Sequence, residues 1–505
     1  MLRDRIRAAF VVVLVAFVVV LRSGGPAVAQ DAGNVWPRFR GPGASGIAAG
    51  AASPPLEFGA GKNQLWKTAL PVGHGSPAIW GDRIFLTGAD PANKKLETIA
   101  IDRATGGIVW RQAVSVEQFE RVHVLGNAAT ATPAVDGERV YAYFGSYGLV
   151  AYDVDGQQVW ELRLPVLQNN FGSGTSPVVA GDLVILNRQE PKDPFIIALD
   201  KKTGKQVWKQ PYQVPPNLPT PYASYSTPLV VGQQVIIHGM NRLDAFDLAT
   251  GERKWWIRIN SSGTSSPIFD GGTIYVASWS PFGEADQLPD LPDFATLLKY
   301  DKNGNGTLSQ DEIPPSLYVF SRPDTPDVPG ATYSVKAAFA RFDTNKDGEL
   351  QKEEWEAGLK YIAQLHADHG LLAVRPGGNG DVTATNVIWK EKTSIPEVPT
   401  PIAYQNRIYM IRNGGILTCV DAATGRVVYR GRVGAPGPYF SSPVIAGSRL
   451  FVTSGDGVIS VLGLGDDLQV LAKNDLGEPI MATPAVVGGV LYVRTASALF
   501  AFGGK

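Results

Sequence analysis

The sequence predicts an all-β fold, an eight-bladed β-propeller of four-stranded sheets that is interrupted once by a small α-helical insertion. Three observations support this prediction. A Ser/Thr-Pro pair recurs eight times along the chain, and a closing motif, A-x-D-x-x-T-G-x-x-x-W, recurs between these pairs. Most pairs lie about 40 to 55 residues apart, a spacing typical of propeller blades. The one longer interval contains two acidic twelve-residue loops.

Residues 1–29 have the order of a secretory signal peptide. Three arginines precede an apolar run from Ala8 to Leu21, and small residues end the segment at Ala29. This order predicts cleavage after Ala29 and a periplasmic or secreted mature chain. The apolar run is shorter than the roughly 20 residues that a membrane span needs, so no span is expected in the mature chain; an uncleaved anchor is the alternative. Residues 30–62 are expected to form an extended lead-in rich in Pro and Gly.

Each repeat is expected to form one blade, because short alternating strands such as residues 139–143 give a sheet a buried face. In the closing motif, Asp can accept hydrogen bonds from the backbone just ahead, and Gly can take the αL conformation before the last strand. The final Trp is a large apolar plate that can pack against the neighbouring blade. The opening pairs end at Pro77, Pro133, Pro177, Pro228, Pro267, Pro401, Pro443 and Pro484. The closing motif spans Ala100–Trp110, Ala198–Trp208 and Ala245–Trp255, and in altered form Ala151–Trp160 and Cys419–Tyr429.

Eight opening pairs predict eight blades, which lie in residues 63–283 and 371–505. The last repeat ends at Phe502 before any closing Trp. The stretch Asn63 to Lys67 has the composition of that missing strand. We therefore expect the N-terminal strand to complete the last blade and close the ring, which leaves no free sheet edge.

Residues 284–370 are expected to form an insertion in blade 5 that binds two calcium ions. Residues 301–312 and 343–354 both fit the calcium-loop pattern D-x-[DN]-x-[DN]-G-x5-E. Calcium prefers six to eight oxygen ligands, which a loop of this length can supply. The first loop offers Asp301, Asn303, Asn305, the Thr307 carbonyl, Ser309 and Glu312, and the second offers Asp343, Asn345, Asp347, the Glu349 carbonyl, Gln351 and Glu354. The alternative is a pair of solvated acidic turns.

The flanks of these loops carry apolar residues at helical spacing. Helices are expected over Thr332–Phe342 and Gln351–Ala367, with a further helix around Phe294 to Leu298. Pro314 and Pro315 predict that the exit helix of the first loop is very short or irregular. The paired loops resemble an EF-hand module, and the resemblance implies that Leu308 and Leu350 lie in a short strand pair between them.

Composition excludes one class of partner. Lys+Arg number 46 against Asp+Glu 47, and this near-zero net charge argues against nucleic acid, which needs a basic surface. Residues 284–368 hold 16 acidic and 8 basic side chains, a net of −8, which leaves about +7 for the rest. Cys419 is the single cysteine, so no intrachain disulfide can form.

The closing motif resembles the tryptophan-docking repeat of the pyrroloquinoline quinone (PQQ) enzymes, and it is similar to the outer-membrane assembly scaffold of the BamB type. Residues 36–42, W-P-R-F-R-G-P, resemble the lead-in of secreted PQQ-like repeat proteins. The resemblance implies either a scaffold or a dehydrogenase. PQQ alcohol dehydrogenases carry two adjacent cysteines beside the cofactor, and this chain has only Cys419. Four aromatic residues could line a cofactor funnel or serve only blade packing: Trp80, Tyr222, Tyr225 and Trp279.

We expect a calcium-binding scaffold whose wheel face holds a protein or glycan partner, working as a monomer. The alternative is a PQQ- and calcium-dependent quinoprotein dehydrogenase, for which no cofactor-binding residue can be assigned. His366 and His369 form an H-x-x-H that could bind a metal but is more typical of a polar helix end. His74 and His238 stand alone and are expected to be structural.

Overall fold

The computed structural model describes residues 34–504 except 124, 170, 214–222, 260, 262, 281–282, 285–287 and 323–331. For residues 364–368 it describes the backbone but not the side chains. The predicted signal peptide and its cleavage after Ala29 lie outside the described residues. Among those residues, no helix is long and apolar enough to cross a membrane.

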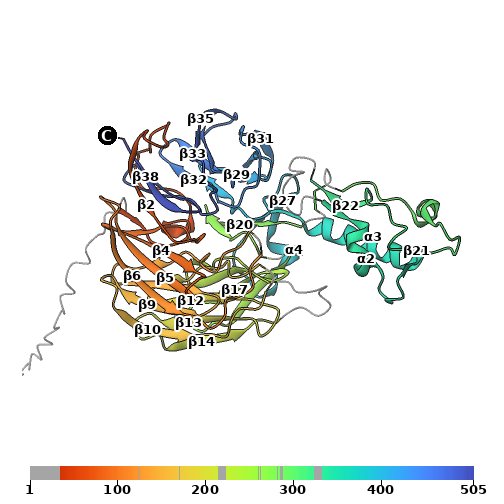
Figure 1. Cartoon of the computed structure of the whole chain (residues 1–505), viewed down its shortest axis with the longest axis horizontal. Coiled ribbons are helices and arrows are strands. Elements are labelled where there is room, and N and C mark those ends of the chain that lie inside the picture. Colours follow the sequence, from red (N-terminus) through yellow and green to blue (C-terminus); the bar gives the residue numbers. More distant parts are fainter. Residues whose placement is uncertain are drawn as a thin grey trace, which may run out of the picture.

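The described residues form eight blades in a wheel (Figure 1), which confirms the predicted eight-bladed propeller. Each blade has four antiparallel strands, and two of the eight sheets gain a fifth strand. Blade 1 consists of β3 (Ala78–Trp80), β4 (Arg83–Asp90), β5 (Lys95–Asp102) and β6 (Ile108–Ser115). Blade 2 consists of β7 (Ala134–Val135), β8 (Arg139–Phe144), β9 (Gly148–Asp153) and β10 (Gln158–Arg163). Blade 3 consists of β11 (Val178–Ala180), β12 (Leu183–Arg188), β13 (Phe195–Asp200) and β14 (Gln206–Pro211). Blade 4 consists of β15 (Leu229–Val231), β16 (Gln234–His238), β17 (Arg242–Asp247) and β18 (Arg253–Arg258).

Blade 5 is assembled from two stretches of chain separated by the insertion. It consists of β19 (Ile268–Asp270), β20 (Thr273–Ser278), β25 (Gly370–Val374) and β27 (Val387–Glu391). Between its last two strands, β26 (Gly380–Asp381) adds in parallel to β18, and α4 (Thr383–Asn386) follows. Blade 6 consists of β28 (Ile402–Tyr404), β29 (Arg407–Arg412), β30 (Ile416–Asp421) and β31 (Val427–Arg432). Blade 7 consists of β32 (Val444–Ala446), β33 (Arg449–Thr453), β34 (Val458–Gly463) and β35 (Val470–Asp475).

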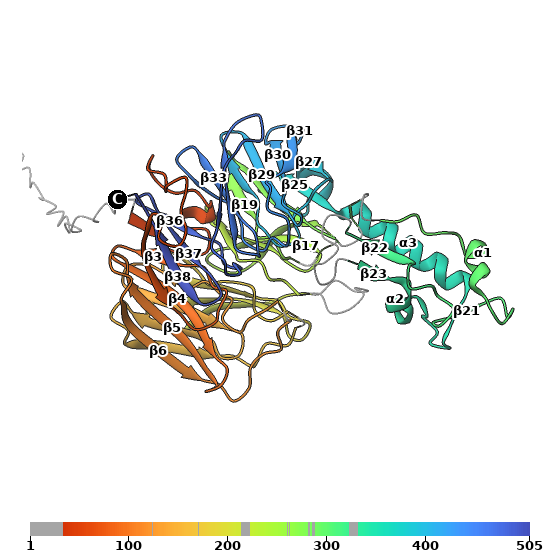
Figure 2. The ribbon, with the colours of Figure 1, turned by 45° about the horizontal axis from the view of Figure 1, so that its top comes forward.

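The N-terminal strand closes the wheel as predicted. Blade 8 consists of β36 (Ala485–Val487), β37 (Val490–Arg494), β38 (Ala498–Phe502) and β2 (Gln64–Ala69), with β2 antiparallel to β38. Trp66 of β2 then packs toward blade 1, and its indole N–H donates to the Arg103 carbonyl at 3.1 Å. Figure 2 shows β36 to β38 lying beside β3 and β4 of blade 1. The first and last parts of the wheel are therefore joined by one composite sheet.

The eight Ser/Thr-Pro pairs form a closed ring of buried hydrogen bonds. In each pair, the residue before Pro donates its backbone N–H to the hydroxyl oxygen of the equivalent residue in the next blade. The first such bond joins Ser76 N to Thr132 Oγ1 at 3.0 Å, and the last joins Thr483 N to Ser76 Oγ at 3.0 Å. The intermediate donors are Thr132, Ser176, Thr227, Ser266, Thr400 and Ser442, at 2.9–3.1 Å. The repeated hydroxyl thus satisfies a buried backbone donor in every blade.

In five blades the closing Trp docks on the closing turn of the next blade, whereas Trp255 of blade 4 donates to Gln234 of its own blade at 3.2 Å. Trp160 shows the pattern: its indole N–H donates to the Lys201 carbonyl at 3.0 Å, and its ring covers Gly204. Gly204 has φ +70°, and an added Cβ would lie 2.6 Å from the ring, so only glycine fits. Asp200 accepts from the backbone N–H of Thr203 at 2.8 Å, which holds the turn. The same docking joins Trp66, Trp110, Trp208 and Trp389 to Gly106, Gly156, Gly251 and Gly425.

The lead-in runs across the axis of the wheel. The first strands of the blades are innermost, because β3 contacts both β7 and β36, and β19 contacts β28. Within the lead-in, β1 (Val35–Trp36) pairs with β3, and Ile47 bridges Ile445 of β32. Arg40 is buried and donates to the carbonyls of Thr400 at 3.0 Å and Pro401 at 2.9 Å in blade 6.

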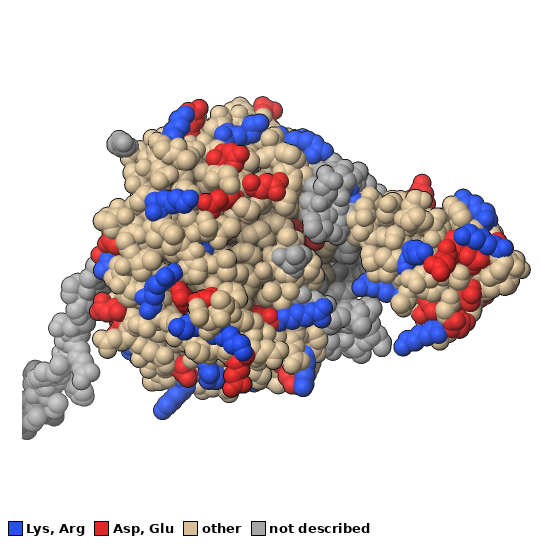
Figure 3. Space-filling model, viewed as in Figure 1, with Lys and Arg blue, Asp and Glu red and all other residues tan. Residues whose placement is uncertain are grey.

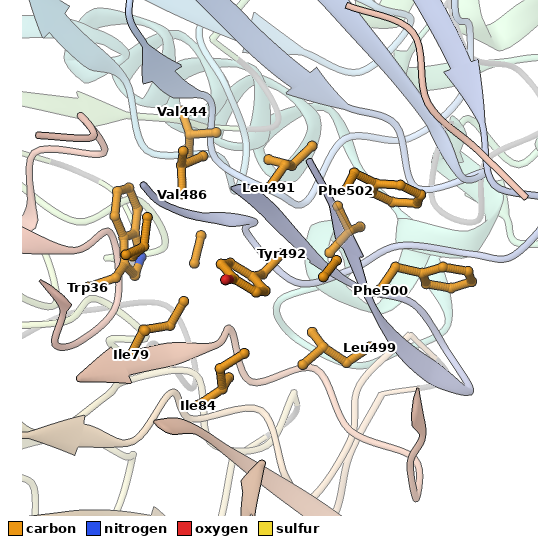
Figure 4. Close-up of a cluster of buried hydrophobic side chains, with 14 of the residues drawn as sticks. Trp36, Ile79, Ile84, Val444, Val486, Leu491, Tyr492, Leu499, Phe500 and Phe502 are labelled. Atoms are coloured by element: carbon orange, nitrogen blue, oxygen red, sulfur yellow. The ribbon is translucent and has the colours of Figure 1, made fainter. Parts of the chain in front are cut away.

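The lead-in also reaches the opposite side of the wheel, because the Pro37 carbonyl accepts from Val135 N of blade 2 at 2.8 Å. Blades 2 and 6 face each other in a ring of eight, so a segment bonded to both fills the space between them. A 3-10 turn, η2 (Pro42–Ala44), reverses the chain there. Figure 4 shows Trp36 beside Ile79 of blade 1, Val444 of blade 7 and Val486 of blade 8.

The insertion projects from blade 5 away from the wheel (Figure 1). Its elements are α1 (Phe294–Leu297), η4 (Leu298–Tyr300), β21 (Leu308–Ser309), β22 (Tyr318–Ser321), β23 (Thr332–Ser334), α2 (Val335–Phe342), β24 (Glu349–Leu350) and α3 (Lys352–Asp368). The helix predicted from Thr332 begins at Val335 instead. Ser334 caps α2 by accepting from Ala337 N at 3.1 Å, and residues 332–334 pair with β22. No helix follows Glu312 in the described stretch up to Tyr318, as Pro314 and Pro315 predict.

Candidate functional site

The two acidic loops of the insertion lie back to back. β21 and β24 pair antiparallel with Leu308 opposite Leu350, as the resemblance to an EF-hand module implies. Both leucines are fully buried in one apolar cluster with Phe339, Phe342 and Trp355. The loops therefore share a core, and their predicted ligands sit on a common rigid support.

The first loop curls around its own acidic side chains. Asp301 accepts from Gly304 N at 2.7 Å and from Gly306 N at 2.9 Å. Glu312 accepts from Lys302 N and from Ser309 N, both at 2.9 Å. Backbone N–H groups of the loop thus hold the carboxylates at positions 1 and 12. Asn303 and Asn305 each accept from the backbone two residues ahead, at 2.9 and 3.0 Å.

The second loop repeats this arrangement. Glu354 accepts from Thr344 N at 2.9 Å and from Gln351 N at 3.1 Å, and Asp343 Oδ2 accepts from Gly348 N at 3.1 Å. Asn345 and Asp347 accept from the backbone N–H groups of Asp347 and Glu349, each at 2.9 Å. Asp343 Oδ1 is buried and has no hydrogen-bond partner among the described residues. A buried carboxylate oxygen without a donor is costly unless a cation binds it.

Both closing glutamates are held in the ionised form. Backbone N–H bonds from Ser309 and Lys302 lower the pKa of Glu312. Burial raises the pKa of Glu354, but hydrogen bonds from the backbone of Asn345, Gln351 and Thr344 outweigh it and lower that pKa overall. Hydrogen bonds that favour the charged carboxylate explain both shifts.

Over the part of the chain that the structure describes, no three His, Cys, Asp or Glu side chains gather as a metal-holding group. The first predicted set has only two such side chains, Asp301 and Glu312. The second has three, Asp343, Asp347 and Glu354, and these three do not gather closely enough to form one. Asp and Glu side chains nevertheless gather on the visible face of the insertion (Figure 3). The loops therefore offer mainly neutral and carboxylate oxygens, the ligands that suit a hard cation.

A buried polar cluster joins the wheel to the neck of the insertion, the two chain segments around residues 279–284 and His369 where the insertion leaves and re-enters blade 5. The Glu284 carboxylate accepts from Ser394 N at 2.9 Å and Ile395 N at 2.6 Å, and it lies 3.3 Å from Arg412 of blade 6. His369 Nε2 contacts Glu284 at 3.1 Å, and its Nδ1 accepts from Ser280 N at 3.0 Å. His369 thus belongs to this cluster, while the side chain of His366, the other half of the predicted H-x-x-H, lies outside the described residues.

The proposed cofactor aromatics do not share a site. Trp80 ends β3 and covers Gly137, where an added Cβ would lie 2.6 Å from the indole, so it docks blade 1 on blade 2. Tyr225 lies against Gly174 between blades 3 and 4. Trp279 lies at the neck, with the Arg322 guanidinium 5.0 Å from its ring centre. Tyr222 lies outside the described residues.

The remaining candidates from the sequence have structural surroundings. His238 is fully buried, contacts the Ser265 carbonyl and Ser261 Oγ at 2.8 and 3.0 Å, and has its pKa lowered to about 4 by burial. Burial, with Arg494 nearby, lowers the pKa of His74 to about 4. Burial raises the pKa of the Cys419 thiol to about 12, so this cysteine is an unreactive core residue.

The sequence did not predict two of the buried charged residues. Arg40 and Glu284 are charged residues that become buried through contacts with positions more than 100 residues away. Only the W-P-R-F-R-G-P segment around Arg40 gave a signal, and it did not reveal that this segment enters the wheel. A single charged residue in an irregular segment carries no periodicity from which its burial could be predicted.

Known proteins share this architecture. The family described as outer membrane protein assembly factor BamB matches residues 58–301 and 341–497. The outer membrane protein assembly factor BamB of Yersinia pestis is 22% identical over 426 residues, which cover 80% of this chain and 90% of that protein. The interval that the family leaves unmatched, residues 302–340, includes most of the first acidic loop.

Solved structures agree at the level of the fold. BamB from Moraxella catarrhalis has a TM-score of 0.53 at 14% identity and covers 88% of this chain and 97% of its own. A europium-containing methanol dehydrogenase has a TM-score of 0.55 at 13% identity, and the match covers 92% of this chain and 90% of that enzyme's chain. An outer membrane protein assembly factor and a methanol dehydrogenase thus share the propeller fold with this chain, and identities this low show the fold alone. Since the family match extends over most of the residues from blade 1 to blade 8, the chain belongs to the outer membrane protein assembly factor BamB family of PQQ-like β-propellers.

Proposed function

We propose that this chain is an extracytoplasmic, calcium-binding scaffold, in which the wheel presents a face to a protein or glycan partner. In this proposal, residues 1–29 are a signal peptide, and residues 284–370 form an EF-hand pair that holds two calcium ions. The unpartnered, buried Asp343 Oδ1 is the observation that carries the calcium assignment. It occupies position 1 of the second loop, in which oxygens of Asn345, Asp347 and Glu354 are also held by backbone N–H groups.

The two ligand sets follow from the sequence pattern of the loops. Asp301, Asn303, Asn305, the Thr307 carbonyl and Glu312 would hold one ion, and Asp343, Asn345, Asp347, the Glu349 carbonyl and Glu354 the other. Bound calcium supplies positive charge that offsets the clustered carboxylates, so it would order the insertion. Extracellular modules bind calcium with a Kd of about 10⁻⁴–10⁻³ M, which suits a structural role.

The scaffold assignment rests on the filled axis of the wheel. Residues 35–48 lie across it, and buried Arg40 bonds to blade 6. A dehydrogenase of this architecture would need a polar, Trp-capped pocket on the axis, and the residues present do not fit one. Trp80 and Trp279 are engaged elsewhere, and Cys419 is buried in blade 6. The family match to an outer membrane protein assembly factor supports a role in binding other proteins.

A pair of double variants tests the calcium sites. Glu312→Gln with Glu354→Gln removes the closing ligand of each loop, whereas Asp311→Asn with Glu353→Gln makes the same change of charge at the preceding, exposed positions. We expect calcium to slow hydrogen exchange across residues 284–370 in the wild type and in the Asp311/Glu353 variant but not in the Glu312/Glu354 variant. Exchange in the wheel should be the same in all three. Equal calcium protection in both double variants would overturn the ligand assignment.

A further inference from the structure

Two consecutive Asn-Gly pairs lie in the first acidic loop, between α1 and β21 at the end of the insertion farthest from the wheel (Figure 2). Asn303 and Asn305 are exposed, and each is followed by a glycine. A Cβ added at Gly304 or Gly306 would meet no atom within 4 Å. Since glycine has no Cβ to hinder its backbone nitrogen, that nitrogen can approach the side-chain carbonyl carbon of the preceding Asn.

One carboxylate is placed to take a proton from both glycine nitrogens. Asp301 Oδ1 accepts from Gly304 N at 2.7 Å, and Asp301 Oδ2 accepts from Gly306 N at 2.9 Å. A backbone nitrogen must lose its proton when it attacks a carbonyl carbon. A carboxylate within hydrogen-bond reach of that proton has the geometry of a general base.

The two Asn carbonyl oxygens each accept from a backbone donor. Asn303 Oδ1 accepts from Asn305 N at 2.9 Å, and Asn305 Oδ1 accepts from Thr307 N at 3.0 Å. Negative charge develops on such an oxygen when a nitrogen attacks the carbon beside it. A donor already aimed at the oxygen stabilises that charge, so both side-chain amides are activated toward attack.

The equivalent Asn of the second loop has the donor but lacks the base. Asn345 Oδ1 accepts from Asp347 N at 2.9 Å, as Asn303 does in the first loop. The next residue is Lys346, whose side chain hinders its nitrogen. The oxygen that corresponds to the base, Asp343 Oδ1, has no hydrogen-bond partner among the described residues. Asn345 is therefore an internal control within the same module.

The chain holds two further Asn-Gly pairs, at Asn379 and Asn413, and the wheel restrains both. Gly380 lies in β26, which is paired with β18. Asn413 Oδ1 accepts from Tyr439 N at 2.7 Å, and its Nδ2 donates to Glu397 Oε2 at 3.0 Å. The side-chain amide of Asn413 is thus fixed at both ends, and it serves as a second internal control.

We propose that Asn303 and Asn305 form a site of spontaneous deamidation that Asp301 assists. The glycine nitrogen bonds to the side-chain carbonyl carbon of the preceding Asn, and the bond from that carbon to the amide nitrogen breaks. Ammonia leaves with the proton that Asp301 has taken from the glycine nitrogen, and a cyclic succinimide remains. Water then opens the ring to aspartate or isoaspartate, so each event replaces a neutral amide by a carboxylate.

The reaction itself needs only water and does not depend on calcium. Its protection by calcium rests on the proposed function. A calcium ion held by Asp301, Asn303 and Asn305 would occupy the carboxylate that takes the proton, so both amides should then be lost more slowly. Calcium-free and calcium-loaded samples therefore separate the two proposals.

The test is peptide mass spectrometry that separates Asn, Asp and isoaspartate, on the full mature chain incubated at neutral pH with EGTA. A positioned base typically accelerates proton transfer by about 10²–10⁴-fold, so Asn303 and Asn305 should be lost at least about tenfold faster than Asn345 and Asn413. Asp301→Asn removes the base and should slow the loss of both amides by a similar factor. The matched control is Asp311→Asn, the same change of charge at an exposed position of the loop.

Gly304→Ala keeps the inference testable if Asp301→Asn disturbs the loop. It adds a Cβ beside one attacking nitrogen and should slow loss at Asn303 but not at Asn305. Equal rates at Asn303, Asn305 and Asn345 would overturn the inference, and so would rates that Asp301→Asn leaves unchanged. If the calcium-free chain loses both amides and calcium gives no protection, the inference stands and calcium binding by the first loop is contradicted.

Discussion

Thr132→Val tests the hydrogen-bonded ring that joins the blades. Thr132 is 2% exposed, and its Oγ1 accepts from Ser76 N of blade 1 at 3.0 Å. Valine has nearly the same shape, so the substitution creates no cavity, but it leaves the buried Ser76 N–H without an acceptor. An orphaned buried donor costs about 1–3 kcal/mol, so the free energy of unfolding should fall by that amount.

The assay is urea denaturation followed by fluorescence, with Thr453→Val as the matched control. Thr453 is also fully buried, but its Oγ1 has no hydrogen-bond partner among the described residues. The control should therefore be neutral or slightly stabilising, because it removes an unpaired polar group. If Thr132→Val were no less stable than Thr453→Val, the ring would not contribute to stability and the reasoning would be refuted.

Three further substitutions or additions probe other parts of the account. Gly106→Ala should lower the free energy of unfolding by about 1 kcal/mol or more beyond the loss caused by Gly81→Ala. Both glycines have positive φ, but only Gly106 lies under a Trp ring, where an added Cβ would be 2.6 Å from the Trp66 side chain. Equal losses would argue against Trp docking. Burial raises the pKa of Glu120 to about 7. Between pH of about 4.5 and 7 the folded chain therefore keeps a proton on Glu120 that the unfolded chain releases. The free energy of unfolding should fall as pH rises through this window. Glu120→Gln should remove that fall and stabilise the chain at pH 8 by up to about 3 kcal/mol, with no gain at pH 4.5; a gain independent of pH would contradict the assignment. Finally, protein mixed with PQQ and calcium and then desalted should show no quinone absorbance, whereas stoichiometric retention would favour the dehydrogenase alternative.

The wheel could be predicted closely because its signals repeat. Eight Ser/Thr-Pro pairs marked eight inner strands, and each hydroxyl proved to accept one bond from the blade before it. The missing closing Trp of the last repeat located the strand that closes the ring, and Trp66 of that strand docks on the closing turn of blade 1. The resemblance of the two loops to an EF-hand module implied the pairing of Leu308 with Leu350.

The features that escaped prediction depend on contacts that occur once. Arg40 meets Thr400 and Pro401 across 360 residues, and no pattern in the lead-in announces this contact. The buried Glu284 likewise accepts from Ile395 N, 111 residues further along the chain. The place of a residue within its repeat can be predicted from the sequence. Contacts between residues of different repeats are known only from the packed structure.

The central claim is that the insertion on this wheel holds calcium. Its most direct test is elemental analysis of the wild-type mature chain after dialysis against millimolar calcium, with the calcium concentration of the dialysis buffer subtracted. The account predicts two calcium ions per chain, one for each loop. A value of zero would contradict it and leave the insertion as a pair of acidic turns.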